Sequence, residues 1–156
     1  MRGESERKRG SKARGGARPA GVAGPVADFA AHPVYQEALR LCGLVLDLES
    51  KFPDDEHPVL YVPLKRCAIE AGSLLASGFG RSAPSVRLDL WERARSRAME
   101  ARHLVLVARM RYVVDARDVD LFEERYFLLL DGIETLIGTA AGEELTSIAA
   151  GPPRER

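Results

Sequence analysis

The chain has 156 residues, of which 46% are hydrophobic and only 6% aromatic, and its formal net charge is zero. This length suits one domain, and the scarcity of aromatic residues favours helices over a β-sandwich. No apolar run approaches the roughly 18 residues that a membrane span needs, so we expect no membrane partner. The basic N-terminus has no apolar signal-peptide core, which predicts a cytoplasmic protein.

Residues 1–28 are predicted to form a basic disordered tail. Its first 18 residues carry seven bases and two acids, and no large apolar residue follows Met1. Such a segment buries too little surface to offset the entropy lost on ordering. Six of its bases are predicted to contact nucleic-acid phosphates, namely Arg7, Lys8, Arg9, Lys12, Arg14 and Arg18.

Two amphipathic helices are expected in the first half of the chain. The first follows His32 and Pro33, where apolar residues recur at three- and four-residue steps: Val34, Ala38, Leu41, Val45 and Leu48. The acidic turn KFPDDEHP ends this helix, because its prolines are incompatible with a helix interior. The second helix is expected over about residues 60–77.

Two further helices complete the predicted fold. One covers about residues 85–114, and the other covers about residues 118–140 with Asp118 as its N-cap. Four amphipathic helices with short connections predict an all-α fold, an antiparallel up-and-down four-helix bundle, over residues 29–141. Residues 142–156 are predicted to form a short flexible C-terminal tail.

The glycines of SLLASGFGRS, residues 73–82, are interpreted as the end of a helix. A phosphate-binding glycine loop follows a strand and opens a helix, whereas this stretch closes an apolar helix. Gly78 is expected to take the left-handed conformation that ends a helix, with Phe79 packing back on the last turn.

Residues 34–81 also carry four short motifs in a regular order. They are Tyr35-Gln36-Glu37-Ala38, Phe52-Pro53, Arg66-Cys67-Ala68 and Gly78-Phe79-Gly80-Arg81. In these motifs the chain resembles the four-helix-bundle family of 23S ribosomal RNA intervening-sequence proteins, which includes the accessory variability determinant of diversity-generating retroelements. The resemblance implies a homopentamer that binds nucleic acid or a reverse transcriptase and has no catalytic activity. The chain departs from the family where Gly72, Leu74 and Ser77 replace a Pro, an Asn and a Glu.

No residue pattern supports an enzyme, a metal or another cofactor. Di-iron bundles use a Glu-x-x-His pair on each of two helices, and this chain has one copy, Glu100-Ala101-Arg102-His103, which is predicted to face away from the core. Cys42 and Cys67 lack metal-ligand spacing and are expected to be small buried residues. We therefore expect a noncatalytic protein.

Arginine is the most informative residue type, because eight arginines and three acids lie between residues 81 and 114. On the predicted third helix one edge of the core stripe carries Arg95, Arg102 and Arg109, and the other carries Arg93, Arg97 and Arg111. Both rows are suited to contact phosphates, and the expected contacts are Arg95, Arg102 and Arg109 of the first row, with Lys65, Arg66 and Arg81 beside the family-like motif. Residues 115–144 hold nine acids that can neutralise the arginines within or between subunits, and we favour this pairing over a nucleic-acid surface while both interpretations stay open.

Self-association is predicted from apolar residues that lie away from the core stripes of the last two helices. Five of them are expected to form one exposed patch, namely Val107, Met110, Val114, Leu121 and Leu128. Contiguous apolar patches mark interfaces, so we expect a homo-oligomer, and the family resemblance favours a pentamer. The alternative function is a protein-interaction scaffold that does not bind nucleic acid.

Overall fold

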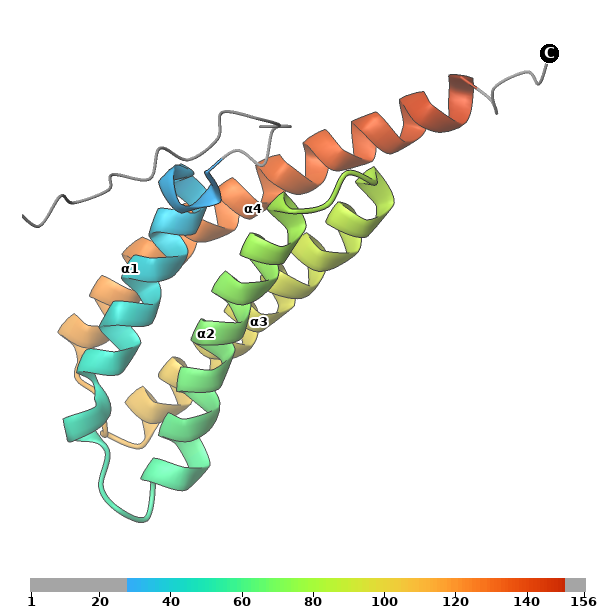
Figure 1. Cartoon of the computed structure of the whole chain (residues 1–156). Helices are drawn as coiled ribbons and strands as arrows, with labels where there is room; N and C mark the ends of the chain where they lie inside the picture. The colour runs from blue at the N-terminus through green and yellow to red at the C-terminus, as the bar shows by residue number, and fades with distance from the viewer. Residues whose placement is uncertain (1–27, 151–156) are drawn as a thin grey trace, which may run out of the picture.

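The computed structural model describes residues 28–150 and shows a four-helix bundle in that part of the chain (Figure 1). The helices are α1 (Pro33–Asp47), α2 (Val62–Phe79), α3 (Pro84–Met110) and α4 (Ala116–Ala150). Each helix packs against the next one along the chain, and α1 packs against α4 to close the ring. No strand occurs between residues 28 and 150. The predicted all-α, up-and-down bundle is therefore confirmed.

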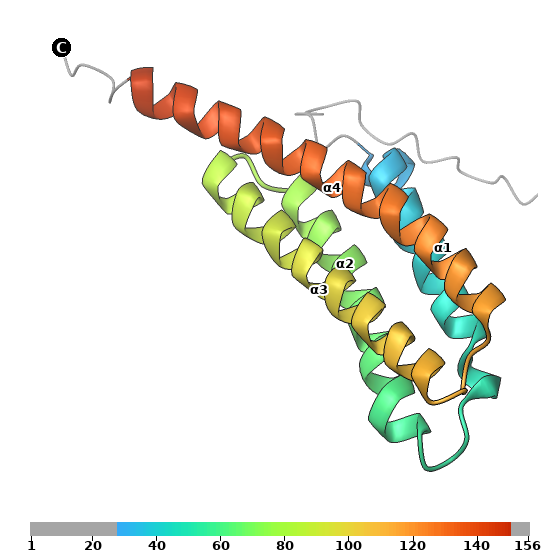
Figure 2. The same cartoon turned by 180° about the vertical axis from the view of Figure 1, so that it is seen from behind.

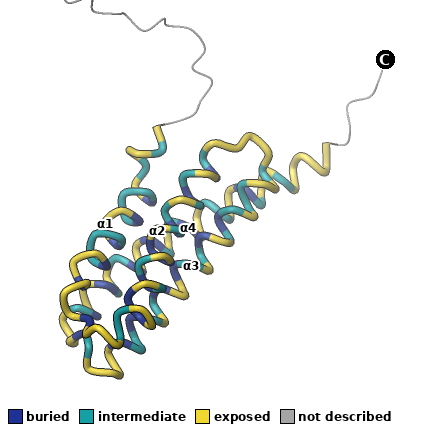
Figure 3. The backbone as a smooth tube through the Cα atoms, turned by 60° about the horizontal axis from the view of Figure 1, so that its bottom comes forward, coloured by how far each residue is buried: buried dark blue, intermediate teal, exposed yellow. Residues whose placement is uncertain are grey.

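In the core, mostly small residues of α3 pack against large residues of the other helices. The buried residues of α3 are Trp91, Ala94, Ala98, Ala101, Val105 and Ala108, whereas α2 and α4 bury Leu64, Leu75, Phe122, Leu129 and Ile133. Because four of the six buried positions on α3 are alanine, its neighbours can approach its backbone closely. Burial of each large side chain contributes roughly 1.5–3 kcal/mol. Figure 3 shows the buried segments inside the bundle.

The last helix is longer than predicted and projects beyond the rest of the bundle (Figures 1 and 2). It continues through Ala150, so the predicted tail boundary at residue 142 is wrong for residues 142–150. This segment contains good helix formers such as Ala, Glu and Leu, and the first residue that cannot continue a helix is Pro152. An ion pair between Glu143 and Arg87 joins the projecting segment to the start of α3.

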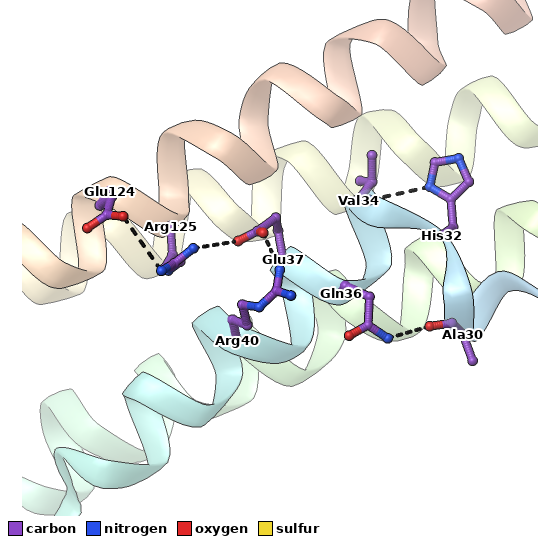
Figure 4. A network of polar contacts seen from close by, with 8 residues as sticks. All are labelled: Ala30, His32, Val34, Gln36, Glu37, Arg40, Glu124 and Arg125. Carbon is purple, nitrogen blue, oxygen red and sulfur yellow. Dashed lines mark hydrogen bonds and ion pairs between the residues drawn. The ribbon is translucent and has the colours of Figure 1, made fainter.

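Polar side chains fix where α1 and α4 begin. The His32 ring accepts a hydrogen bond from the Val34 backbone amide at 3.3 Å and caps α1 (Figure 4). At α4 the predicted N-cap, Asp118, is wrong. The Asp115 carboxylate accepts from the Asp118 amide at 2.9 Å, and the Asp118 carboxylate accepts from the Asp115 amide at 3.1 Å. This reciprocal pair makes Asp115 the cap and Asp118 its partner three residues later.

Gly78 has a packing role instead of the predicted left-handed conformation. It lies inside α2 and is buried, and the helix ends one residue later with Gly80 as its C-cap. A Cβ atom on Gly78 would lie 2.2 Å from Nε1 of Trp91. The Phe79 ring packs against Trp91, with ring centroids 5.6 Å apart. The stretch therefore does end a helix, as predicted, but its first glycine is required because α2 and α3 touch there.

We predict that Gly78→Ala lowers the free energy of unfolding by roughly 1–3 kcal/mol, because the new methyl group overpacks against Trp91. Gly142→Ala is the matched control. A Cβ there meets nothing within 4 Å, and alanine is the better helix former, so this variant should gain up to about 1 kcal/mol. Urea unfolding followed by circular dichroism measures both, and equal effects would contradict the packing role of Gly78.

The turn between α3 and α4 holds a tyrosine in the left-handed conformation. Tyr112 has a φ of 59° and is 87% exposed. Its amide donates to the Arg109 carbonyl at 3.0 Å, and the Val113 amide donates to the Ala108 carbonyl at 2.9 Å. These two bonds form a Schellman motif, in which the position of Tyr112 normally belongs to glycine. The tyrosine costs roughly 1–2 kcal/mol there, because its Cβ crowds the following carbonyl.

We predict that Tyr112→Gly raises the free energy of unfolding by about 1 kcal/mol, because glycine adopts this conformation without steric cost. Tyr112→Ala keeps a Cβ at the same position and should leave stability nearly unchanged. Thermal unfolding of the two variants distinguishes relief of backbone strain from loss of the exposed ring. A gain in both variants would contradict the strain argument.

Candidate nucleic-acid interface

Charge is divided unevenly between the two halves of the bundle. Residues 62–110, which span α2 and α3, carry nine bases and four acids. Residues 28–61 carry two bases and seven acids, and residues 111–150 carry three bases and nine acids. The α2–α3 hairpin is therefore the basic side of an otherwise acidic bundle. A surface that contacts phosphates is therefore expected on this hairpin.

The outer side of this hairpin contains a polar hollow of about 440 Å³ between α2 and α3. Its walls are formed by Glu70, Ser73, Leu74 and Ser77 of α2 and by Arg93, Ser96 and Arg97 of α3. Residues three, four or seven apart share a helix face, which explains how each helix presents its side chains to the same space. Arg93 and Arg97 belong to the second predicted arginine row, whereas the serines were not among the predicted site residues. The four-residue spacing of Ser73 and Ser77, which matches that of Arg93 and Arg97 on the facing helix, was the available signal.

Carboxylates partly neutralise the arginines of the hollow. Arg97 donates to Glu70 at 2.8 Å and to Glu100 at 2.6 Å. The hydrogen bond to Glu100 and the charge of Glu70 raise the pKa of the Arg97 guanidinium, and the same hydrogen bond lowers the pKa of the Glu100 carboxyl. Arg93 lies 3.7 Å from Asp89 in an exposed pair, which is a weak interaction. A phosphate in the hollow would compete with Asp89 for Arg93 and with Glu70 for Arg97.

Two of the predicted phosphate contacts are engaged with α4 instead. Arg95 Nη1 lies 2.9 Å from Glu134. Arg102 donates from Nε and Nη2 to one Glu123 oxygen at 2.9 and 2.6 Å, and its guanidinium stacks near the rings of Tyr126 and Phe127. For these two arginines the structure therefore favours neutralisation by acids of α4.

The remaining predicted bases of the folded part lie in different places. Arg66 and Arg81 are exposed and have no ion pair to another residue between 28 and 150. The Arg97 hydrogen bond is the main cause of the lowered pKa of the Glu100 carboxyl, and the charge of Arg66 contributes to it. Lys65 lies over the Tyr61 ring at 5.1 Å, and Arg109 is exposed near the end of α3. Six predicted bases lie outside the described residues: Arg7, Lys8, Arg9, Lys12, Arg14 and Arg18.

The five residues of the predicted apolar patch do not form one surface. Val114 is only 1% exposed, because α3 ends at Met110 and the following turn directs Val114 into the core. Val107 is half-buried and packs against the core. Leu121 lines a hollow with residues of α1, whereas Glu123 of the same helix contacts α3. Leu121 and Leu128, seven residues apart, are therefore exposed on the α1 side of α4, away from Met110.

The described residues offer no obvious metal centre. No group of three or more His, Cys, Asp or Glu side chains between residues 28 and 150 is arranged to hold a metal ion. His103 is exposed. In the same part of the chain, no helix combines the length and the hydrophobicity needed to cross a membrane.

Comparison with known proteins returns no match, whether by protein-family model, by curated sequence or by solved structure. The resemblance to the intervening-sequence proteins therefore stays a prediction.

We predict that Arg102→Ala lowers the free energy of unfolding by about 1–2 kcal/mol, since it removes two charge-assisted hydrogen bonds and the stacking on two rings. Arg66→Ala is the matched control and should change stability by less than about 0.5 kcal/mol, because Arg66 is exposed and unpaired among the described residues. Urea unfolding measures both. Equal effects would show that the α3–α4 pairing is not structurally important.

Proposed function

We propose that the protein is a noncatalytic, oligomeric bundle that binds nucleic acid, or a nucleic-acid enzyme such as a reverse transcriptase. In this proposal the bases of residues 1–18 and the α2–α3 hairpin contact phosphates. The observation that carries it is the charge of this hairpin, which has nine bases and four acids on a bundle that is acidic elsewhere. Phosphate contacts of this kind are sequence-independent and dominate nonspecific affinity.

The ion pairs of α3 support a specific choice of contact residues. Arg95 and Arg102 already bind carboxylates of α4 and would have to lose those partners. Arg66 and Arg81 have no such partner among the described residues, and Arg93 has only a weak one. These three arginines are therefore the proposed contacts of the folded part. The polar hollow, which Arg93 lines, lacks aromatic side chains that stack on bases, so we expect little sequence preference.

Self-association would strengthen weak phosphate contacts. Each copy would bring one basic N-terminal segment, and several segments on one assembly raise the effective concentration of binding sites. Exposed Leu121 and Leu128 on the α1 side of α4 support a contact between copies, since grouped apolar side chains mark interfaces.

We predict that labelled single-stranded RNA and DNA bind the full chain with an affinity that falls steeply as salt increases. Replacement of the six tail bases by Gln should remove most of this affinity. Arg66→Gln with Arg81→Gln should lower the slope of log affinity against log salt by up to about 2, because two phosphate contacts are lost. Arg40→Gln with Arg117→Gln is the matched control on the acidic side and should leave the slope unchanged. Fluorescence anisotropy at several salt concentrations measures all four proteins.

The second candidate is a protein-interaction scaffold, which the exposed side chains of Leu121, Phe127 and Leu128 on α4 favour. Absence of RNA and DNA binding at low salt would reject direct nucleic-acid binding and favour the scaffold. Equal slopes of log affinity against log salt for the Arg66/Arg81 variant and the control variant would reject phosphate contacts by the α2–α3 hairpin. Such a result would not bear on the N-terminal bases. Light scattering tests self-association separately, and a monomer at micromolar concentration would remove that part of the proposal.

A further inference from the structure

The end of α4 carries an apolar face that the rest of the described chain leaves exposed. Ala140 is the last buried residue of this helix, and residues 141–150, which we call the tip, project beyond the rest of the bundle (Figures 1 and 2). Leu145 and Ile148 of the tip are 69% and 68% exposed. With Ala141 they are spaced three or four residues apart and therefore share one face of the helix. Helices in proteins gain most of their stability when such a face is packed, so the tip is suited to a partner.

A shallow groove between α1 and α2 has the same apolar character. It contains a hollow of about 150 Å³, which no charged residue lines. Leu39 and Ile69 line this hollow and are each 47% exposed, and Leu46, seven residues after Leu39 on the same side of α1, is 45% exposed. A cavity of about this volume holds a benzene molecule, so the hollow has room for an aliphatic side chain. We call the hollow with these three side chains the α1–α2 groove.

The tip matches the groove in length but does not reach it within one copy. Leu39 to Leu46 spans about 10 Å along α1, and Ala141 to Ile148 spans the same distance along α4, because each pair is seven residues apart. The tip is a continuous part of α4, and it runs past the α2–α3 turn and away from α1 (Figures 1 and 2). Helix α4 would have to break before the tip could fold back onto its own groove. The groove is therefore open to the tip of another copy.

The charges beside the two surfaces are opposite. The tip carries two acids and no base, and its Glu144 lies four residues before Ile148, on the same side of the helix. Lys65 likewise lies four residues before Ile69 on α2. Neither Glu144 nor Lys65 forms an ion pair with another residue between 28 and 150. Opposite charges at the edge of an apolar contact favour one orientation of the partners over others.

We propose that the tip of one copy lies in the α1–α2 groove of a second copy, with Leu145 and Ile148 against the apolar side chains of the groove. Glu144 of the tip then lies beside Lys65. This contact rests on the self-association in the proposed function, but it uses a surface other than the exposed leucines on the α1 side of α4. Because tip and groove are different surfaces, the contact is heterologous, and its repetition builds a closed ring or an open filament.

The decisive test mixes two variants that are each defective in one of the two surfaces. Leu145→Glu with Ile148→Glu places charge on the tip and leaves the groove intact, whereas Leu39→Glu with Ile69→Glu places charge in the groove and leaves the tip intact. Each variant alone should associate at least about tenfold more weakly than the wild type, because the contact would bury unpaired charge. An equimolar mixture should form a one-to-one dimer, because one intact tip meets one intact groove. Light scattering measures all three samples.

The matched control is Thr139→Glu with Thr146→Glu, which adds the same charge on the opposite side of the end of α4. It should associate like the wild type. All the substituted side chains are exposed, so each variant should unfold cooperatively near the wild-type temperature when followed by circular dichroism.

Cys42 reports directly on the groove, because it lines the hollow and is only half-buried. The second thiol, Cys67, is buried, and burial raises its pKa to about 11, so it serves as a slowly reacting internal reference. Thiol labelling followed by peptide mass spectrometry should show that Cys42 is protected as the concentration of the wild type rises. The tip variant should lose this protection.

The outcomes separate this contact from the rest of the proposed function. A wild type that is monomeric at micromolar concentration would overturn both the contact and the proposed self-association. A wild type that associates no more strongly than the tip variant or the groove variant, or a mixture of the two that gives no dimer, would overturn the contact alone. Absence of RNA and DNA binding would reject the nucleic-acid proposal and would leave the contact standing if the mixture forms a dimer.

Discussion

The arrangement of the surface depends on the close contact between α2 and α3. Alanines at four of the six buried positions of α3 bring its neighbours close, and Gly78 allows the Trp91 indole to lie against the α2 backbone. Because this contact fixes both helices, Arg93 and Arg97 lie opposite Ser73 and the other polar residues of α2. The polar hollow is therefore a consequence of core packing as much as of the polar residues around it.

The arginines of α3 serve two different purposes because the helix lies between two neighbours of different charge. On the α4 side, Arg95 and Arg102 meet carboxylates and bind the two helices together. On the α2 side the acids are fewer, so Arg93 stays weakly paired while Arg97 binds Glu70. A single basic helix thus supplies both structural ion pairs and cations that are available to a partner.

Much of the fold was predictable, because three- and four-residue apolar periodicity is a local property that core burial only reinforces. The errors lie where distant residues compete with local signals. Local signals predict that Gly78 terminates a helix, but in the fold Gly78 lies against Trp91. Val114 is predicted to be exposed because the predicted third helix extends four residues beyond Met110, where α3 ends. The candidate site was harder to predict, because which arginine meets a carboxylate depends on how α2, α3 and α4 are oriented.

By itself, the sequence determined the number of helices, their apolar faces and the basic character of residues 62–110, since each follows from residue type and spacing along one chain. Only the tertiary structure decided which charges neutralise each other, that Asp115 caps α4, and that Leu121 faces α1 and lies apart from Met110. The physical reason is that ion pairs and exposed patches depend on distances between helices. Those distances are set by packing of the whole core, which periodicity within one helix does not specify.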